Sequence, residues 1–501
     1  MRSLQRSLPN AALAAIGVSV ALMVAVGVAG PSAAVPGLRA APGSSRWWPP
    51  YSAHLSPSPA LVSFALWLAV AAGGAGVAAG LVAVRRGWRP RPRTLIIGSL
   101  LAVIALMLVP PIGSTDILDY AIYGRIAALG HSPYLITPAR FKLSGDPVGA
   151  IAPAPWAHIV SVYGPLATAS QKAASELAGA SAARTLFWLK AWNALAYLAI
   201  VAVLDLALRS DAAGRARAHL LWALNPLMLL AVMAGGHIDG LAAAAGVAGL
   251  VAIKRLNFFN ALSAGILVAA AVAIKAPFAL FGAGLVWAAR RSPGALAAAA
   301  LGAAAVLVPS YLLAGPHALS ALATKGAAGS VDLYEPWQLL YRALSWPAPS
   351  QRIDVIAAVA AVLLAGLLLW RMPAGLDRQP AVRVALALTL AWLVTSPQQR
   401  PWFDAMLFPL LALTPATRLD WIALGRLVAA SAAELPGITF YTGLRPHWLA
   451  VVADVISRGL APIALTGLTV ALIWLCVTRR WTPEGKNPVV SEPEPARKLA
   501  Q

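Results

Sequence analysis

Two carboxylates and two phenols follow an apolar stretch at helical spacing. Asp116, Asp119, Tyr120 and Tyr123 occupy positions i, i+3, i+4 and i+7, so on a helix they share one face. A carboxylate on such a face can act as a general base. The same spacing fits helix capping, with Asp116 as the N-cap and Asp119 closing an acidic capping box. Both interpretations predict a helix that begins near Asp116.

A second polar group lies in the Gly-Gly-His-Ile-Asp-Gly segment 235–240, between two apolar stretches. Glycine and asparagine would be enough to make a turn there, so His237 and Asp239 need another explanation. They form either a hydrogen-bonded pair at the membrane interface or part of a functional site. Because a zinc site takes at least three protein ligands, this pair alone does not predict a metal centre.

Two cations also interrupt apolar sequence. An ammonium at mid-bilayer costs about 2.5–3.5 kcal/mol on insertion scales. Lys275, close to Pro277, either snorkels to the lipid headgroups or binds a phosphate. Arg400, in the short segment 395–402, allows the same phosphate-binding interpretation because a guanidinium can bind phosphate through two hydrogen bonds.

The amino-acid composition indicates that these residues belong to a membrane protein. The chain has 501 residues, of which 59% are hydrophobic and 11% charged, whereas soluble domains are about 45–50% apolar and about 25% charged. So much apolar surface must face lipid.

The net charge of +21 comes from short basic clusters between apolar stretches, without the basic face of a nucleic-acid-binding protein. The single cysteine, Cys476, excludes a disulfide framework and a cysteine-based metal site. We therefore expect membrane lipids as partners and no nucleic acid.

Apolar stretches predict an all-α polytopic membrane protein with about fourteen transmembrane helices, since a span needs about 20 apolar residues. The first stretch is longer than a typical signal-peptide core, which favours an uncleaved anchor. The predicted spans are 11–30, 60–84, 94–112, 186–208, 219–234, 238–253, 258–274, 276–289, 295–313, 353–370, 381–396, 402–414, 421–437 and 459–478. We expect one integral membrane domain, 1–480, and a disordered cytoplasmic tail, 481–501.

The basic residues orient these spans. Most of the 39 Lys and Arg residues fall in short loops if the N-terminus is inside, and such loops set orientation. Two long loops, 113–185 and 314–352, then lie outside. A shorter outer segment, 31–59, carries Trp47, Trp48 and Tyr51, which suit an interfacial aromatic belt. Each candidate group described above falls on the outer side in this topology, which was derived without them.

Several short stretches, in order, resemble the polyprenol-phosphate-mannose-dependent α-(1→6)-mannosyltransferases of actinobacteria, which belong to the GT-C superfamily. The resemblance covers roughly residues 60–420. It rests on Thr115–Arg125, His131–Tyr134, Tyr163–Pro165, Gly235–Asp239, Ala273–Pro277 and Ser396–Trp402. It implies a GT-C-like helical bundle with long outer loops, in the plasma membrane of a bacterium, with its active site on the outer face.

The resemblance implies an inverting mannosyl transfer from polyprenyl-phosphate-mannose to a cell-envelope glycan or glycolipid acceptor. Asp116 matches the catalytic Asp of the family, with Asp119 beside it. We expect no cofactor, and a divalent metal stays open. The donor phosphate would be bound by Lys275, Arg400, Arg125 and His237. The sugar and acceptor would contact Tyr120, Tyr123, Tyr163, Trp156, Asp239 and Trp402.

Two alternatives remain at this stage. A flippase for lipid-linked sugars would also be polytopic, but transporters usually carry internal repeats and ionisable residues near the midplane. Here Asp205, Glu434 and Lys190 are the ionisable residues that we expect within helices at such a position, and no repeat is apparent. A GT-C enzyme that uses another polyprenyl-phosphate sugar is the second alternative, because sugar identity depends on contacts that the sequence does not place.

Overall fold

Helices make up the secondary structure of this chain. The computed structural model describes residues 2–38, 48–153, 156–319, 334–344, 351–373, 380–435 and 446–481. Within these ranges there is no β-strand, only a bridge between Ser32 and Val35. The all-α prediction is therefore confirmed for the described part of the chain.

The described helices follow one another along the whole chain. Up to the middle of the chain they are α1 (Arg2–Ala29), α2 (Pro59–Arg85), α3 (Pro92–Leu108), α4 (Asp116–Ala128), α5 (Pro138–Lys142), α6 (Pro165–Ala178), α7 (Ala182–Ala207), α8 (Ala212–Ala218), α9 (Pro226–Met228) and α10 (Asp239–Ala252). The remainder are α11 (Phe258–Ile274), α12 (Ala279–Ala289), α13 (Pro293–Ala314), α15 (Trp337–Ala343), α16 (Gln351–Arg371), α17 (Pro380–Thr395), α18 (Phe408–Leu413), α19 (Leu419–Glu434), α20 (His447–Asp454) and α21 (Ala461–Thr478). Short 3₁₀ or π turns join or extend them at Gly149–Ile151, His219–Ala223, Leu229–Ala234, Ala276–Phe278, Pro401–Met406 and Val455–Leu460.

Local sequence explains where many helices begin. Proline occupies the first helical position of α2 and α13, where its missing N–H would have no partner in any case. Ser58 and Ser292 precede these prolines and accept hydrogen bonds from backbone N–H groups of the first turn. Ser181 caps α7 in the same way. These caps place the helix starts close to the starts of the apolar stretches.

The predicted spans all coincide with helical segments, but the count of about fourteen stays a prediction. Seven described helical segments are long and apolar enough to cross a membrane, and six shorter apolar helical segments of 10–17 residues accompany them. The segment 219–234 is interrupted at Asn225, where π turns flank the three-residue helix α9. Helices as short as these need not each cross the bilayer alone.

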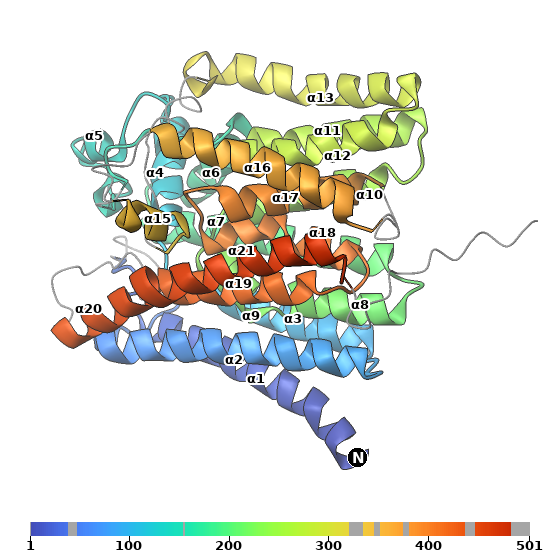
Figure 1. The fold of residues 1–501 in the computed structure, drawn as a ribbon. Helices are drawn as coiled ribbons and strands as arrows, with labels where there is room; N and C mark the ends of the chain where they lie inside the picture. Colours follow the sequence, from blue (N-terminus) through green and yellow to red (C-terminus); the bar gives the residue numbers. More distant parts are fainter. Residues whose placement is uncertain are drawn as a thin grey trace, which may run out of the picture.

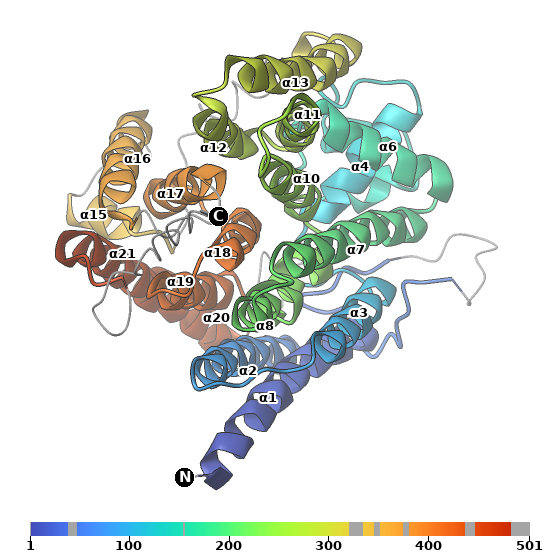
Figure 2. The same cartoon turned by 90° about the vertical axis from the view of Figure 1, so that its right-hand side faces the viewer.

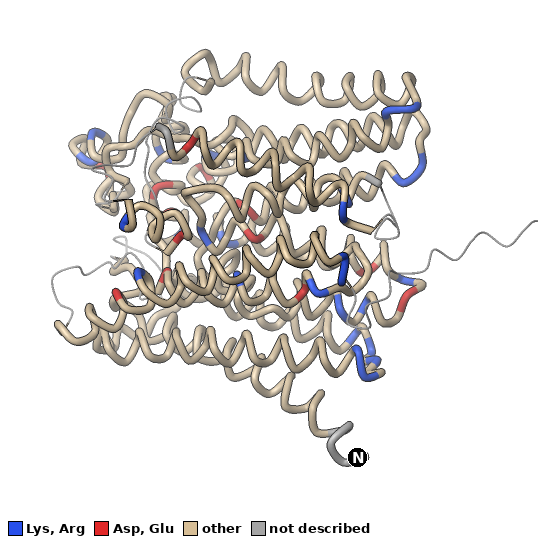
Figure 3. Tube along the Cα trace, in the orientation of Figure 1, with Lys and Arg blue, Asp and Glu red and all other residues tan. Residues whose placement is uncertain are grey.

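The long helices run side by side, so the molecule has two distinct ends (Figures 1 and 2). Helices α4, α5 and α15 lie at the left-hand end in Figure 1. Lys and Arg residues gather at the opposite end, around the connections between long helices (Figure 3). This is the charge asymmetry that the short basic loops predicted.

Some predictions concern residues outside the described ranges. Trp47, the tail after Trp481 and much of the second predicted outer loop lie there. The described part of that loop contains α15 (Trp337–Ala343).

Candidate active site

Asp116 is the first helical residue of α4. Thr115 occupies the N-cap position and makes no side-chain cap hydrogen bond. Neither carboxylate oxygen of Asp119 has a hydrogen-bond partner among the described residues. The capping-box interpretation of this pair is therefore wrong. The side chain of Asp116 keeps 14% of its surface exposed, which leaves its carboxylate accessible from the end of the bundle.

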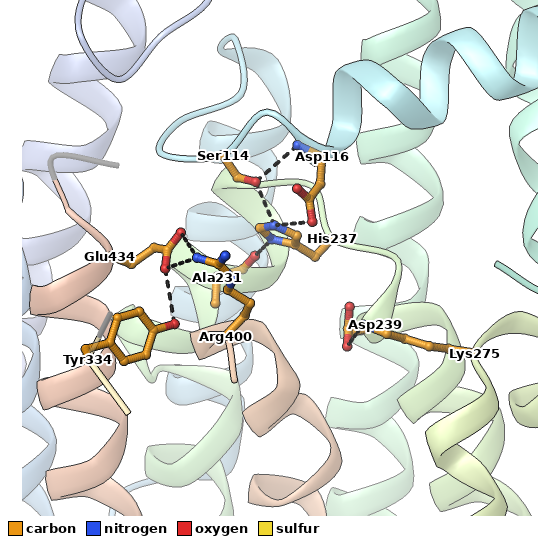
Figure 4. A network of polar contacts seen from close by, with 9 residues as sticks. All are labelled: Ser114, Asp116, Ala231, His237, Asp239, Lys275, Tyr334, Arg400 and Glu434. Atoms are coloured by element: carbon orange, nitrogen blue, oxygen red, sulfur yellow. Dashed lines mark hydrogen bonds and ion pairs between the residues drawn. The ribbon is translucent and has the colours of Figure 1, made fainter. Parts of the chain in front are cut away.

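A short hydrogen-bond chain connects α4 with the segment that carries His237 (Figure 4). The backbone N–H of Asp116 donates to Ser114 Oγ at 3.2 Å, and Ser114 Oγ lies 2.9 Å from His237 Nε2. On the other side of the ring, His237 Nδ1 contacts the carbonyl oxygen of Ala231. A carbonyl only accepts, so Nδ1 carries the proton and Nε2 accepts from the Ser114 hydroxyl. Asp116 Oδ2 is 3.8 Å from the same Nε2.

Burial lowers the pKa of His237 to about 3, more than the contact with Ala231 raises it. The imidazole is therefore neutral at physiological pH, with Nε2 free of a proton. This arrangement does not favour the predicted donation from His237 to a phosphate. It favours a role in which the ring positions Ser114 beside Asp116.

The backbone around His237 permits this close approach. Residues Leu229–Ala234 form a π turn, and π turns occur frequently at functional sites. Gly236 has φ +73°, and a Cβ there would lie 2.2 Å from Ile117 Cδ1 of α4. Only glycine fits this position, because a side chain would push α4 away from the turn.

Lys275 and Asp239 form a buried ion pair, with Lys275 Nζ 2.6 Å from Asp239 Oδ1. Lys275 follows the last residue of α11, in extended backbone before the turn that contains Pro277. The snorkelling interpretation of Lys275 is wrong, since only 9% of its side chain is exposed. The alternative in which His237 and Asp239 form a hydrogen-bonded pair is wrong as well, because each contacts a different partner. Asp239 Oδ2 has no partner among the described residues.

Arg400 pairs with Glu434, the last residue of α19, with Nη1 to Oε1 and Oε2 distances of 3.0 and 2.9 Å. The hydroxyl of Tyr334 lies 3.1 Å from Glu434 Oε2. Two aromatic residues that follow Arg400 contact His237 and Lys275. Trp402 stacks on His237 with ring centroids 3.6 Å apart, and Lys275 Nζ lies 4.1 Å from the centre of the Phe403 ring. The segment 400–403 therefore contacts Glu434, His237 and Lys275.

Tyr120, Tyr123 and Tyr163 of the first outer segment differ in their contacts. Tyr120 and Tyr163 meet edge to face, with centroids 5.0 Å apart. Gly164 N–H donates to Ile274 O at 3.1 Å, which places Tyr163 beside the residue before Lys275. A Cβ at Gly164 would lie 2.1 Å from Ala273 O. The Tyr123 hydroxyl instead donates to Ile159 O at 2.8 Å, and this bond orders the loop.

Asp119 lies one turn after Asp116 but in a different environment. It is 3% exposed and packs among the apolar residues between α4, α6 and α7. Burial, reinforced by the nearby charge of Asp116, raises the pKa of Asp119 to about 9. A carboxyl group that keeps its proton at pH 7 is a poor general base. The geometry therefore favours Asp116 over Asp119 as the base.

The structure does not bring every predicted site residue together. Arg125 lies nine residues along α4 from Asp116, which is about 13 Å, and its Nε contacts Asp146 Oδ2 at 2.8 Å. Trp156 belongs to a loop that is bonded to α5 through Ala157 O. Neither contacts the groups drawn in Figure 4.

Ser114, Glu434 and Tyr334 were not predicted as site residues. Together with His237 and Trp402, Ser114 and Glu434 line a cavity of about 30 Å³. Two signals were present in the sequence. Ser114 stands two residues before Asp116, and Glu434 is a charge at the end of an apolar stretch. Tyr334 carried no such signal.

The family model described as alpha-(1->6)-mannopyranosyltransferase, N-terminal domain, matches residues 14–291. The match covers more than half of the chain and includes Asp116, His237, Asp239 and Lys275. This chain belongs to that mannosyltransferase family. A search of curated proteins finds no match.

Membership of the family makes the chain a glycosyltransferase, and its apolar helices make it a membrane protein. A mannosyltransferase needs a sugar donor and a glycan acceptor. The flippase alternative loses its basis, because the family is one of transferases. In this mannosyltransferase, the matched region ends at Arg291, whereas Arg400, Trp402 and Glu434 lie beyond it. The site therefore combines residues from both parts of the chain.

Proposed function

We propose that this mannosyltransferase moves a mannosyl residue from polyprenyl-phosphate-mannose to a hydroxyl of a cell-envelope glycan or glycolipid, with inversion and an α-(1→6) linkage. The observation that carries the proposal is the placement of Asp116. Its partly exposed carboxylate lies at the start of α4, beside the imidazole of His237, and the buried Lys275 and the half-buried Arg400 lie in the same region (Figure 4). These groups meet at one end of an apolar helical bundle, where a lipid-linked donor can reach them.

The proposed reaction is a direct displacement. Asp116 takes the proton of the acceptor hydroxyl while that oxygen attacks the anomeric carbon. The bond from the anomeric carbon to the phosphate oxygen breaks, and its electron pair leaves with the polyprenyl phosphate. A positioned general base contributes about 10²–10⁴-fold to such a step. The lipid phosphate gains negative charge as it leaves, so fixed cations nearby stabilise the transition state.

Lys275 and Arg400 are the proposed ligands of that phosphate. An ammonium carries three N–H donors and a guanidinium carries five, so each can bridge a carboxylate and a phosphate oxygen. In the geometry observed, each cation contacts a carboxylate, Asp239 or Glu434. These carboxylates hold the cations in place and offset the cost of burying them. Because each cation keeps N–H donors for a phosphate oxygen, the proposal includes no cofactor and leaves the role of a divalent metal to experiment.

The proposed contacts to the sugars come from Asp239 and Tyr163. Asp239 Oδ2 can accept a hydrogen bond from a sugar hydroxyl, since it is buried without a partner among the described residues. The half-buried ring of Tyr163 can pack against a sugar ring, while Tyr120 is buried and packs edge to face against Tyr163. Trp402 is engaged with His237, which favours a positioning role for its ring.

We place the reaction on the outer face of a bacterial plasma membrane, with active-site residues between 113 and 185 outside. Basic residues gather at the end of the bundle opposite α4 (Figure 3), which supports this orientation through the positive-inside rule. No activated nucleotide sugar is required there, because the donor arrives within the membrane.

The proposal is tested with membranes that contain the chain, several radiolabelled polyprenyl-phosphate sugars and a set of oligosaccharide acceptors. Transfer from the mannosyl donor alone, with an α-(1→6) product, is the expected result. Preferential transfer from a pentosyl or glucosyl donor would instead support the alternative, an enzyme that uses another polyprenyl-phosphate sugar. Absence of transfer from every donor, by folded protein, would refute the proposed reaction.

A further inference from the structure

A second cavity lies at the end of the bundle opposite Asp116. It has a volume of about 230 Å³, against about 30 Å³ for the cavity beside His237. The C-terminal ends of α2 and α7, the start of α8 and the connection from α18 to α19 enclose it. Figure 2 views the molecule from this end, where α8 lies next to α2, α18 and α19. None of the proposed transfer chemistry uses this cavity.

One ion pair forms the buried side of the cavity. Arg217 is 3% exposed and contacts both carboxylate oxygens of Asp420, at 2.5 and 2.8 Å. Its remaining N–H groups donate to Leu411 O and Thr414 O, at 3.0 and 2.7 Å. The charge of Asp420 is therefore matched by Arg217, and both side chains are fixed.

Two more guanidinium groups line the cavity and are held by backbone carbonyls. Arg85 Nη2 donates to Thr417 O at 2.9 Å and lies 3.7 Å from Asp420. Arg89 Nη1 donates to Val84 O and Trp88 O at 2.7 and 2.8 Å. Carbonyl oxygens orient these cations without neutralising them.

Asp211, the second carboxylate that lines the cavity, does not bring the net charge of the lining to zero. Asp211 Oδ1 accepts hydrogen bonds from the N–H groups of Ala213 and Gly214, at 3.1 and 2.9 Å, as the N-cap of α8. Three guanidinium groups against two carboxylates leave the lining with one net positive charge. Cationic side chains that are already positioned favour binding of a phosphate group through charge-assisted hydrogen bonds.

We propose that this cavity binds the phosphate of an anionic phospholipid headgroup, at the face of the membrane opposite the active site. Leu81, Val84 and Leu208 line it together with the arginines, and they would contact the carbon atoms that follow the phosphate. Free inorganic phosphate shares the anionic chemistry but gains nothing from these apolar walls. A bound headgroup would link α2 to the α18–α19 connection and stabilise the bundle.

The test compares lipids and variants in purified full-length protein. Thermal midpoints are measured in neutral detergent with added phosphatidylglycerol, phosphatidylcholine or inorganic phosphate, and bound lipids are counted by native mass spectrometry. Phosphatidylglycerol should raise the midpoint of the wild type. Arg89→Gln should bind it about tenfold more weakly, since a charge-assisted hydrogen bond is lost, and Arg85→Gln serves as the second variant should Arg89→Gln fail to fold.

Arg290→Gln is the matched control. Arg290 donates to Trp287 O and stacks on the Trp287 ring at the same end of the molecule, outside the cavity. Arg290→Gln should keep the full response to phosphatidylglycerol. An equal loss in Arg290→Gln and Arg89→Gln would overturn the site in favour of general surface charge. A response to inorganic phosphate that equals the lipid response would overturn the headgroup as the occupant.

Discussion

At the scale of single residues, two neighbouring carboxyl groups differ because their surroundings differ. Asp116 is partly exposed beside His237, whereas Asp119 is buried among apolar side chains without a hydrogen-bond partner among the described residues. Helical spacing alone placed both on one face and did not separate them, and only the resemblance to the family pointed to Asp116. Packing of α4 against α6 and α7 makes the difference.

Asp116→Asn tests the proposed base. Asn keeps the size of the side chain but cannot accept a proton, so turnover should fall by a factor on the order of 10² or more while the thermal midpoint stays near that of the wild type. Glu176→Gln is the matched control, because Glu176 is an exposed acid in the same outer segment, paired with Lys172 at 3.7 Å. Radiolabelled mannosyl transfer in membranes measures both. A near-wild-type rate for Asp116→Asn would move the assignment to another acid.

Asp119→Asn tests the buried carboxyl group through pH. The pKa of Asp119 is about 9 in the folded chain and about 3.9 in an unfolded one. As pH rises between these values, the unfolded state loses its proton first, so the folded protein becomes less stable. Asn does not titrate, so the midpoint advantage of Asp119→Asn should grow from pH 5 to pH 9. A constant difference across thermal scans in that range would contradict the raised pKa.

At the scale of elements, breaks in helices place the cations and the imidazole. Lys275 follows the end of α11, His237 follows a π turn, and Arg400 precedes a 3₁₀ turn. Each break leaves a polar side chain at one end of the bundle instead of along a lipid-facing surface. The sequence showed the breaks through Gly and Pro, but it did not show which charges pair across them.

Lys275→Ala tests the ion pair and the phosphate role separately. Loss of one partner leaves the Asp239 charge buried, which costs about 3–5 kcal/mol, so the thermal midpoint should fall sharply. The double variant Lys275→Met with Asp239→Asn removes both charges and should recover much of that midpoint. At limiting donor concentration, the rate of mannosyl transfer should stay low in the double variant. It should also be lower than the rate of Asp239→Asn alone. Full activity of the double variant would show that the phosphate is bound elsewhere.

Gly164→Ala tests the contact that links the first outer segment to α11. The added Cβ would lie 2.1 Å from Ala273 O, so the two backbones must separate and both stability and transfer should decrease. Gly294→Ala is the control, since a Cβ at that helical position meets nothing within 4 Å. Thermal scans and transfer assays on the two variants should differ clearly. Equal tolerance of both would mean that the backbones are not in contact.

At the scale of the whole molecule, the charge distribution and the position of the site support one orientation. Cysteine labelling tests it in a background where Cys476 is replaced by serine. A cysteine at exposed Ser144 should react with an impermeant maleimide in intact cells, whereas one at exposed Arg255, at the opposite end, should react only after lysis. The reverse pattern would place the site on the cytoplasmic side.

The sequence by itself determined the class of the molecule and the positions of its helical segments, and it singled out most of the polar groups that we propose for the site. Hydrophobicity and capping are local properties, and the polar groups that interrupt apolar stretches are visible one by one. Only the tertiary structure decided which groups meet. Lys275 pairs with Asp239 from 36 residues away, and Arg400 with Glu434 from 34. Arg125, one of the predicted phosphate ligands, contacts Asp146 instead. Such pairs depend on how helices pack, because a buried charge takes whichever opposite charge the packing brings within reach.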